Sequence, residues 1–479
     1  MAAWQLTSED LKRYPHFDSW LSIEDAKSLA TDPNAVATHT FYPFMLYKNR
    51  WTRFAAAGEA GDVKERPIRY SARGDAYIYS YYRHLLAGAY EAALSKASLS
   101  GSILAYRRIR DADGKGKCNI HFARDAFEKI SVLGNCCVVA LDISGFFESL
   151  DHSLLKAVWC ELLDVNKLPE DHFKVFRAIT RYSVVEKQAV YERLGYFGIK
   201  QKSASGKGTL GYLIPYNKMP RQLCTGHEFR QKIAGGNGSK NLIEVNLRTY
   251  GIPQGSPISD LLANAYLLKF DRVLQERMEA LGGVYYRYSD DILLICPGGE
   301  EIGKSLAIEV RDQIKKHGSK LVIKEKKSSV FVFSSSGSTQ TCALVEGTQG
   351  KNGLEYLGFR FDGKRVFIRD STLSNLYRKV TRTARYAANS FVKRYPGKDR
   401  KFLIAGFDYE KLIQNFGRVQ DFGEFADDYR TWTFWTYARR AAHVFGQDGL
   451  SITRQLRAFR EHVRARAAEE LHNAIERSR

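Results

Sequence analysis

The sequence predicts a mixed α+β fold, in which an antiparallel sheet in the middle of the chain is followed by an α-helical C-terminal region. Residues 136–143 (CCVVALDI) are a compact apolar run rich in β-branched residues, which is typical of a buried strand. Residues 284–296 (VYYRYSDDILLIC) are two apolar or aromatic runs around a short polar centre, which favours a hairpin. After about residue 370, arginines and lysines crowd stretches with helical spacing, which indicates basic helices.

The other segments follow in chain order. Residues 1–60 mix aromatic and charged residues and are expected to form an N-terminal extension, helical or irregular. Residues 77–94 repeat apolar and aromatic side chains at the short intervals of a helix. Residues 195–240 are rich in Gly, Lys and Ser, which predicts a long loop or insertion. Residues 320–333 have the pattern of two short strands, and a change of composition near residues 360–370 marks the start of the helical region.

The net charge points to the class of partner. The chain has 479 residues and a formal net charge of +20, which favours a polyanion, with nucleic acid first and an anionic membrane surface second. No run of about 18 apolar residues exists, so we expect no membrane-spanning segment. The N-terminus lacks a secretory pattern, and the seven cysteines lack C-x-x-C spacing. We therefore expect a cytoplasmic protein without a zinc knuckle or a disulfide framework.

Two acidic motifs lie at the ends of predicted buried strands: Asp142 in VVALDISGFF, and Asp290-Asp291 in RYSDDILL. Carboxylates beside buried strands cost desolvation energy, and adjacent carboxylates raise one another's pKa. Mg²⁺ offsets both effects, because it prefers oxygen ligands and takes one or two carboxylates together with substrate phosphates. The arrangement suits two-metal phosphoryl transfer, with Asp142 and Asp290 bridging the metals and Asp291 supporting them. Taken alone, an Asp-Asp pair is more often a solvated turn.

Five motifs in order resemble the reverse transcriptase family over about residues 60–370. Residues 288–291 (YSDD) resemble its Tyr-x-Asp-Asp box, and residues 142–147 (DISGFF) resemble its first palm aspartate with paired aromatics. Residues 251–259 (GIPQGSPIS) resemble its Pro-Gln-Gly motif. Residues 354–359 (LEYLGF) resemble the Leu-Gly hinge that grips the primer, and Lys327-Ser328 takes the place of a Lys-Thr-like pair.

The resemblance implies a right-hand polymerase fold. Fingers would span residues 61–135, and a palm with an antiparallel sheet would span 136–345, interrupted by the 195–240 insertion. The thumb and the basic α-helical region would span 346–479. The implied activity is RNA-directed DNA synthesis from dNTPs with two Mg²⁺ ions, for which Mn²⁺ is a possible substitute.

The resemblance also assigns roles to individual residues. The implied catalytic residues are Asp142, Asp290 and Asp291, and the implied metal ligands are Asp142, Ile143, Asp290 and Asp291. The implied nucleotide-binding residues are Phe147 (a gate against the ribose 2′-OH), Gln254, Gly255, Arg66, Arg73 and Lys327. The implied primer and template contacts are Tyr288, Leu357 and Gly358. The run of Lys and Glu at residues 324–327 leaves the register of the lysine open by one residue.

Within the family, the chain is most similar to bacterial defence and abortive-infection enzymes. The similarity rests on residues 66–82 (RPIRYSARGDAYIYSYY), 105–110 (AYRRIR) followed by 119–130 (NIHFARDAFEKI), and 220–233 (PRQLCTGHEFRQKI). It implies a non-coding RNA partner and a role against phage, with DNA as the product. Two alternatives stay open: a template-independent DNA polymerase that makes homopolymers, and a catalytically idle RNA-binding scaffold. Homo-oligomer formation, the priming mode and the identity of the template also stay open.

Overall fold

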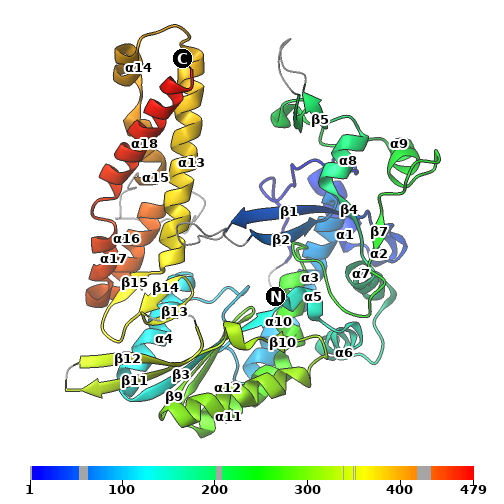
Figure 1. Cartoon of the computed structure of the whole chain (residues 1–479). Helices are drawn as coiled ribbons and strands as arrows, with labels where there is room; N and C mark the ends of the chain where they lie inside the picture. Colours follow the sequence, from blue (N-terminus) through cyan, green and yellow to red (C-terminus); the bar gives the residue numbers. More distant parts are fainter. Residues whose placement is uncertain are drawn as a thin grey trace.

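The computed structural model describes residues 3–52, 63–200, 208–337, 339–348, 350, 352–417 and 433–478. Within them the chain forms three regions, which Figure 1 shows as a sheet-bearing base, a column of helices on one side and a mixed α/β region on the other. We call these regions the palm, the thumb and the fingers.

The palm is built on a sheet with the strand order β12-β11-β3-β9-β8. Its strands are β3 (Cys136–Ser144), β8 (Val284–Tyr288), β9 (Asp291–Pro297), β11 (Ser329–Ser336) and β12 (Thr339–Glu346). The short strand β10 (Val322–Ile323) pairs with the end of β3. All neighbouring strands in this order are antiparallel. The strand predicted at residues 136–143, the hairpin predicted at 284–296 and the strand pair predicted at 320–333 all occur in this sheet.

Both faces of the palm sheet are buried, and strand alternation divides the side chains between two cores. Cys137, Val139 and Leu141 of β3 pack on one face, in a core with the palm helices. Cys136 and Val138 pack on the other face, in a core shared with the thumb. The palm helices are α5 (Phe146–Ser149), α6 (His152–Leu163), α10 (Ser259–Tyr266), α11 (Leu268–Ala280) and α12 (Glu300–Lys315). Helix α4 (Asn119–Leu133) belongs to the core shared with the thumb.

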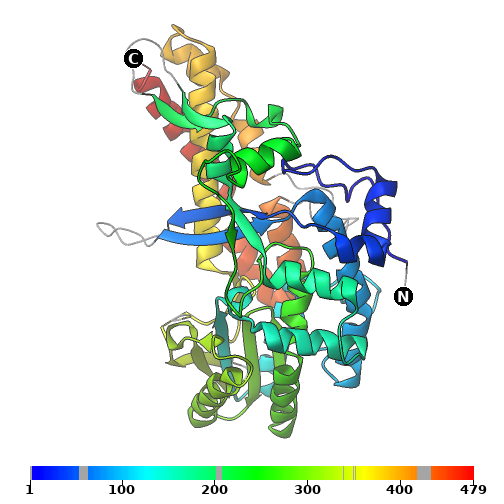
Figure 2. The ribbon, with the colours of Figure 1, turned by 90° about the vertical axis from the view of Figure 1, so that its right-hand side faces the viewer.

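The fingers contain a second sheet with the strand order β2-β1-β4-β7. Its strands are β1 (Phe44–Thr52), β2 (Val63–Tyr70), β4 (Ser183–Glu186) and β7 (Glu244–Val245). Strands β1 and β2 form an antiparallel hairpin, which projects from the fingers in Figure 2. The expected boundary at residue 60 divides this hairpin, because β1 lies in the segment expected to be a separate N-terminal extension.

The fingers also contain several helices. They are α1 (Ile23–Thr31), α2 (Pro33–Thr38), α3 (Arg73–Lys96), α7 (Glu170–Thr180) and α8 (Lys187–Arg193). The region expected to be a loop or insertion contains β5 (Phe197–Lys200), β6 (Thr209–Tyr212), α9 (Gly226–Glu228) and short turns of helix. Met219, Leu223 and Ile233 from this region pack with Met45 of β1 and Val185 of β4. The insertion is therefore part of the fingers core.

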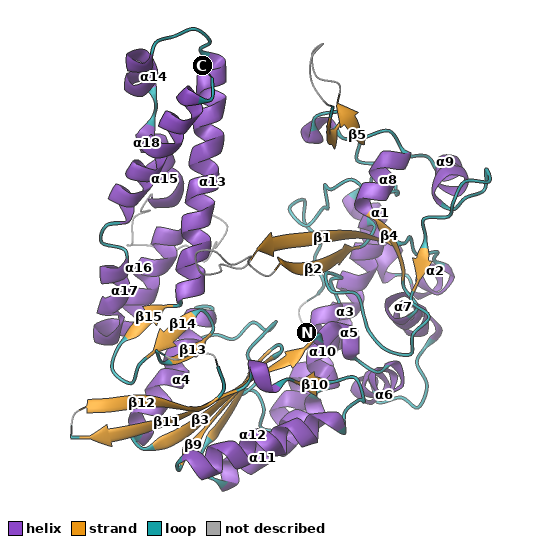
Figure 3. Cartoon of the chain, in the orientation of Figure 1, coloured by secondary structure: helices purple, strands orange, loops and turns teal. Residues whose placement is uncertain are grey.

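The thumb is a bundle of helices on a three-stranded sheet, as the colouring of Figure 3 shows. The strands are β13 (Leu354–Tyr356), β14 (Phe359–Phe361) and β15 (Val366–Ile368). The helices are α13 (Asp370–Arg394), α14 (Arg400–Gly406), α15 (Tyr409–Gly417), α16 (Phe434–Phe445), α17 (Leu450–Gln455) and α18 (Phe459–Glu476). Helix α13 buries every fourth residue from Leu376 to Val392 and leaves its basic residues outward, which is the amphipathic pattern of a packed surface helix.

None of the helices in the described residues combines the length and the apolar character needed to cross a bilayer. The predicted α+β class, with an antiparallel sheet followed by a basic helical region, is confirmed.

Candidate active site

The acidic residues come together where the central palm strands end. Strands β3 and β9 pair in a register that places Asp142 opposite Asp291. Tyr288 pairs with Asp291 across the β8–β9 hairpin, so Ser289 and Asp290 form a two-residue turn. Ser289 has φ of 62°, a left-handed conformation that tight hairpin turns require and few L-residues adopt. The turn brings all three carboxylates to one end of the sheet.

Ile143 contributes to this site through its backbone. Its side chain is 0% exposed, and its N–H donates to the carbonyl oxygen of Asp290 at 2.9 Å. Only its carbonyl oxygen is therefore chemically suited to be the metal ligand that the sequence predicts.

The electrostatics of the site favour an added cation. Burial, reinforced by the negative charges of Asp290 and Asp142, raises the pKa of Asp291 to about 7. Burial also raises the pKa of Asp290, and the charge of Asp142 adds to the effect. The ammonium of Lys327 acts in the opposite direction on both. Near neutral pH the carboxylates thus carry more negative charge than their surroundings favour.

Lys327 provides a positive charge at one end of this cluster. Its ammonium pairs with the carboxylate of Asp142, and both side chains are about one-third exposed. It is the last residue of a short helical turn between β10 and β11. Lys327 therefore reaches the acidic cluster, and its contact with the triphosphate stays a prediction.

The donor set fits a hard divalent cation. The described residues contain no ready-made cage of three or more His, Cys, Asp or Glu ligands. Magnesium sites that act on phosphates need no such cage, since the ion keeps waters and takes one or two carboxylates plus phosphate oxygens. Asp142, Asp290, Asp291 and the carbonyl of Ile143 supply oxygen donors only, and Asp142 already attracts an ammonium. These residues would hold the ion.

The predicted nucleotide-binding loop packs between the palm and the fingers. The carbonyl oxygen of Gln254 accepts a hydrogen bond from the N–H of Arg69 in β2 at 3.0 Å. Gly255 has φ of 115°, and a Cβ there would lie 2.6 Å from the Arg69 carbonyl oxygen, so the loop requires glycine. The carbonyl of Phe147 accepts from the N–H of Ile252 at 2.8 Å. Phe147, Gln254 and Gly255 are thus brought together beside the fingers.

The structure corrects one predicted phosphate contact. The guanidinium of Arg73 is 2% exposed and pairs with Asp18 in the N-terminal segment, so it has no access to a triphosphate. Arg66 is exposed on β2 and faces Asn49 of β1. Arg69 pairs with Glu148 at 3.1 Å, one residue beyond Phe147. Arg69, rather than Arg73, is the second fingers arginine that faces the palm.

The sequence interpretation missed Arg69 and Tyr106. Arg66 and Arg69 are three residues apart on one strand, so alternation places them on opposite faces. The segment RPIRY shows this spacing, but it does not show which of the two faces meets the palm. Tyr106 belongs to the AYRRIR segment and has φ of 64°. Its hydroxyl lies 3.0 Å from the Ser289 Oγ in the turn between β8 and β9. Only its distance from Ser289 in the folded chain reveals it.

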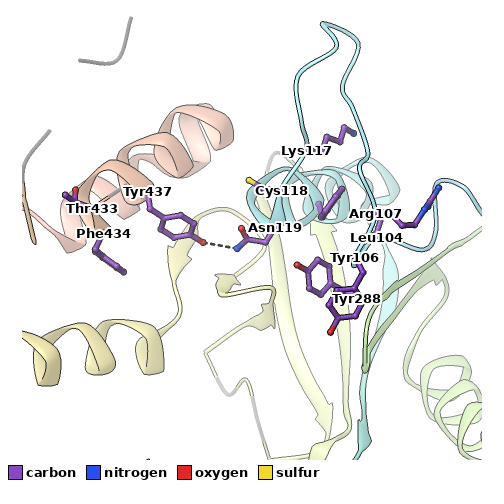
Figure 4. A pocket seen from close by; sticks show the side chains of 11 residues that line it. Leu104, Tyr106, Arg107, Lys117, Cys118, Asn119, Tyr288, Thr433, Phe434 and Tyr437 are labelled. Carbon is purple, nitrogen blue, oxygen red and sulfur yellow. Dashed lines mark hydrogen bonds between the residues drawn. The ribbon is translucent and has the colours of Figure 1, made fainter. Parts of the chain in front are cut away.

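A pocket of about 560 Å³ lies beside Tyr288, between the β8–β9 hairpin, α4 and α16. Figure 4 shows its lining. Its aromatic lining residues are Tyr106, Phe122, Tyr288, Phe434 and Tyr437. Palm, fingers and thumb all contribute to it.

The predicted primer hinge lies at this pocket's edge. Leu357 and Gly358 form the two-residue turn between β13 and β14, with φ of 46° and 94°. The side-chain amide of Asn119 donates to the Leu357 carbonyl at 3.0 Å and to the Tyr437 hydroxyl at 2.9 Å, the second of which is drawn in Figure 4. Asn119 therefore ties α4 to both the hinge and the thumb.

Comparisons with known proteins agree with this geometry. Residues 224–361 match the family described as reverse transcriptase (RNA-dependent DNA polymerase). The matched segment contains Gln254, Asp290, Asp291, Lys327 and Gly358. No curated protein matches the chain.

Among solved structures, the apo telomerase from Candida tropicalis truncated from its C-terminal domain has a TM-score of 0.36 and 10% identity, over 72% of this chain and 60% of that one. The telomerase from Candida albicans in complex with a TWJ fragment of telomeric RNA has a TM-score of 0.35 and 10% identity, over 93% and 63%. This chain thus spans less than two thirds of the length of either. The antiparallel palm sheet and the helical C-terminal region agree with the α+β architecture that the sequence predicts.

Proposed function

We propose that this chain, whose residues 224–361 match the reverse transcriptase family, is an RNA-directed DNA polymerase that uses dNTPs. The observation that carries the proposal is the convergence of Asp142, Asp290 and Asp291 beside the Gln254-Gly255 loop. These residues come from three separate parts of the sequence and meet at one end of the palm sheet.

The reaction joins the 3′ oxygen of a primer to the α-phosphorus of a dNTP, while the bond to the β-phosphate breaks and pyrophosphate leaves. Bound divalent ions, which we propose to be two Mg²⁺, would lower the pKa of the attacking hydroxyl and stabilise the leaving oxygen. Asp142, Asp290, Asp291 and the carbonyl of Ile143 would hold them. Asp291 supports the charge balance at the base of the turn.

The other residues position the substrates. The ring of Phe147 would exclude a ribose 2′-OH, and Gln254 would hydrogen-bond near the sugar of the incoming nucleotide. Arg66 and Lys327 provide positive charge for the triphosphate. Lys327 can leave Asp142 for the phosphates once a divalent ion takes its place.

On the primer side, Tyr288 and the Leu357-Gly358 hinge would hold the primer terminus. They border the pocket between palm, fingers and thumb. The pairing of Tyr288 with Asp291 across the hairpin supports the assignment for Tyr288.

We also propose that the enzyme acts in a bacterial cytoplasm as part of an antiphage defence system, with a non-coding RNA as template or scaffold. The support is the similarity of residues 66–82, 105–110 and 220–233 to defence-associated enzymes. The formal net charge of +20 suits a large RNA partner.

The test is a polymerisation assay on the protein with its co-purifying RNA, supplied with Mg²⁺ and each labelled dNTP or NTP in turn. The Asp290→Asn/Asp291→Asn double variant runs beside it, because Asn keeps the size of the side chain and removes the charge. We expect DNA from the wild-type protein only, with a sequence that is complementary to the RNA.

Other products would change the assignment. A homopolymer unrelated to the RNA would replace templated synthesis with terminal addition. If wild type and double variant both make no polymer with any nucleotide and still bind RNA equally, the protein is a scaffold and the proposed activity is wrong.

A further inference from the structure

A fully buried ion pair lies directly behind the catalytic turn. Arg287 in β8 and Asp271 in α11 are both 0% exposed, and their nearest side-chain atoms are 2.7 Å apart. Burying two charges is costly, and well-packed apolar residues often stabilise a fold equally well. The geometry around the pair indicates what it contributes besides stability.

All five N–H groups of the Arg287 guanidinium donate hydrogen bonds. Nε and Nη2 donate to the two carboxylate oxygens of Asp271, each at 2.7 Å. Nη1 donates to the side-chain oxygen of Asn264 at 3.0 Å, and Nη2 donates to the Asn264 carbonyl at 3.1 Å. The remaining bond runs from Nη1 to the carbonyl oxygen of Ser289 at 3.1 Å. The side chain therefore has one fixed orientation.

The bond to Ser289 acts on the peptide that precedes Asp290. The carbonyl oxygen of Asp290 itself is held as well, because it accepts a hydrogen bond from the N–H of Ile143 at 2.9 Å. Asp290 is thus fixed by the arginine on one side and by β3 on the other. Ser289 adopts φ of 62°, a conformation that needs such support in a residue other than glycine.

The same arginine connects the turn to the nucleotide-binding loop. Asn264 lies in α10, which begins at Ser259, five residues after Gln254. The Asn264 amide also donates to the carbonyl of Ala105 at 2.8 Å, beside Tyr106, whose hydroxyl reaches Ser289. The palm helix, the fingers segment and the catalytic turn therefore share one hydrogen-bond network.

We propose that Arg287 is a positioning residue, which holds the Ser289 peptide so that the Asp290 carboxylate stays in the orientation that binds the divalent ion. The proposal rests on the proposed polymerase function. Arg287 itself would not touch the substrate, because its side chain is fully enclosed by protein.

The test compares Arg287→Lys with Arg73→Lys. Both changes replace a buried, ion-paired arginine by a lysine, which keeps the charge and loses the planar fork. The hydrogen bonds of the Arg73 guanidinium go to Asp18 in the N-terminal segment. We expect both variants to melt at lower temperature. Only Arg287→Lys should need several-fold more Mg²⁺ for half-maximal activity and lose about 10- to 100-fold in kcat, with the KM for primer–template unchanged.

A second readout does not need polymerisation. We expect Mg²⁺ to raise the melting temperature of the wild-type protein and of Arg73→Lys, and to raise that of Arg287→Lys much less. If Arg287→Lys keeps the wild-type Mg²⁺ response and kcat, the arginine is only structural and the proposal is wrong. If the wild type shows the Mg²⁺ response and makes no DNA, the proposed function fails while the positioning role stands.

Asn264→Ala covers the case in which Arg287→Lys does not fold. It removes one acceptor from the guanidinium and leaves the ion pair with Asp271 in place. We expect the same rise in Mg²⁺ requirement, in weaker form. A wild-type Mg²⁺ requirement in a folded Asn264→Ala protein would overturn the proposal.

Discussion

At the residue scale, Phe147 should decide which sugar the enzyme accepts. It lies in α5, half-buried, five residues after Asp142, and its neighbour Phe146 is buried in the core. We expect Phe147→Ala to raise the kcat/KM for NTPs relative to dNTPs by about tenfold or more, because a steric block to the 2′-OH is removed. Steady-state assays with matched nucleotide pairs measure the ratio. Phe146→Leu is the control, which should lower stability and leave the ratio unchanged.

Asp291 should give the metal-free protein a characteristic pH dependence. Its pKa is raised from 3.8 to about 7, so between about pH 4 and 7 the folded state holds a proton that the unfolded state has released. The free energy of unfolding should therefore fall as pH rises through this window, by at most about 1.4 kcal/mol per pH unit from this group. Asp291→Asn should remove this contribution.

Denaturant titrations in EDTA at several pH values measure this effect. We expect Asp291→Asn to be more stable than the wild type at pH 8, with the difference vanishing toward pH 4. Saturating Mg²⁺ should favour the wild type instead. Parallel stability curves for the two proteins over the whole pH range would contradict the expected charge repulsion.

At the scale of elements, two glycine turns should respond differently to the same substitution. A Cβ at Gly255 would lie 2.6 Å from the backbone oxygen of Arg69, whereas at Gly358 the nearest atom is the Tyr437 hydroxyl at 3.9 Å. Gly255→Ala must therefore displace the nucleotide-binding loop from β2. Gly358→Ala meets only the cost of its positive φ, about 1 kcal/mol.

We expect Gly255→Ala to lower kcat/KM for dNTPs by about 100-fold, because the loop moves relative to the catalytic carboxylates. Gly358→Ala should lower the melting temperature slightly and leave dNTP use near the wild-type level. Kinetics and thermal melting of the two variants separate these effects. Equal kinetic losses in both would show that the contact with β2 does not position the loop.

At the scale of the whole molecule, the positive charge should make RNA binding steeply dependent on salt. Lys379 and Arg382 are exposed on thumb helix α13. If both contact phosphates, Lys379→Gln/Arg382→Gln should reduce the slope of log K against log salt by about 1.5. Binding of the co-purifying RNA at several salt concentrations measures the slope.

The control for this experiment lies on the opposite side of the palm sheet. On α12, Lys315 is exposed and Lys304 is partly exposed, and Lys304→Gln/Lys315→Gln makes the same change in net charge. We expect it to leave the slope unchanged. Equal reductions in the two double variants would show that net charge, rather than the thumb surface, determines RNA affinity.

Local patterns in the sequence were enough to predict the main strands and helices and the order of the motifs. The apolar run at residues 136–143 and the pair of runs at 284–296 predicted the central strands to within a residue or two, because alternation and turn residues are encoded locally. The basic helices of the thumb were equally visible in their spacing. The convergence of Asp142 with Asp290 and Asp291 followed from the order of these motifs.

The tertiary structure alone decided which side chains meet. It paired β1 with β2 across the expected boundary at residue 60, buried Arg73 against Asp18 and turned Arg69 toward the palm. It also placed Arg287 behind the catalytic turn. The physical reason is that the periodicity of a strand or helix separates its faces without specifying their partners, and burial and ion pairing depend on residues far away in the sequence.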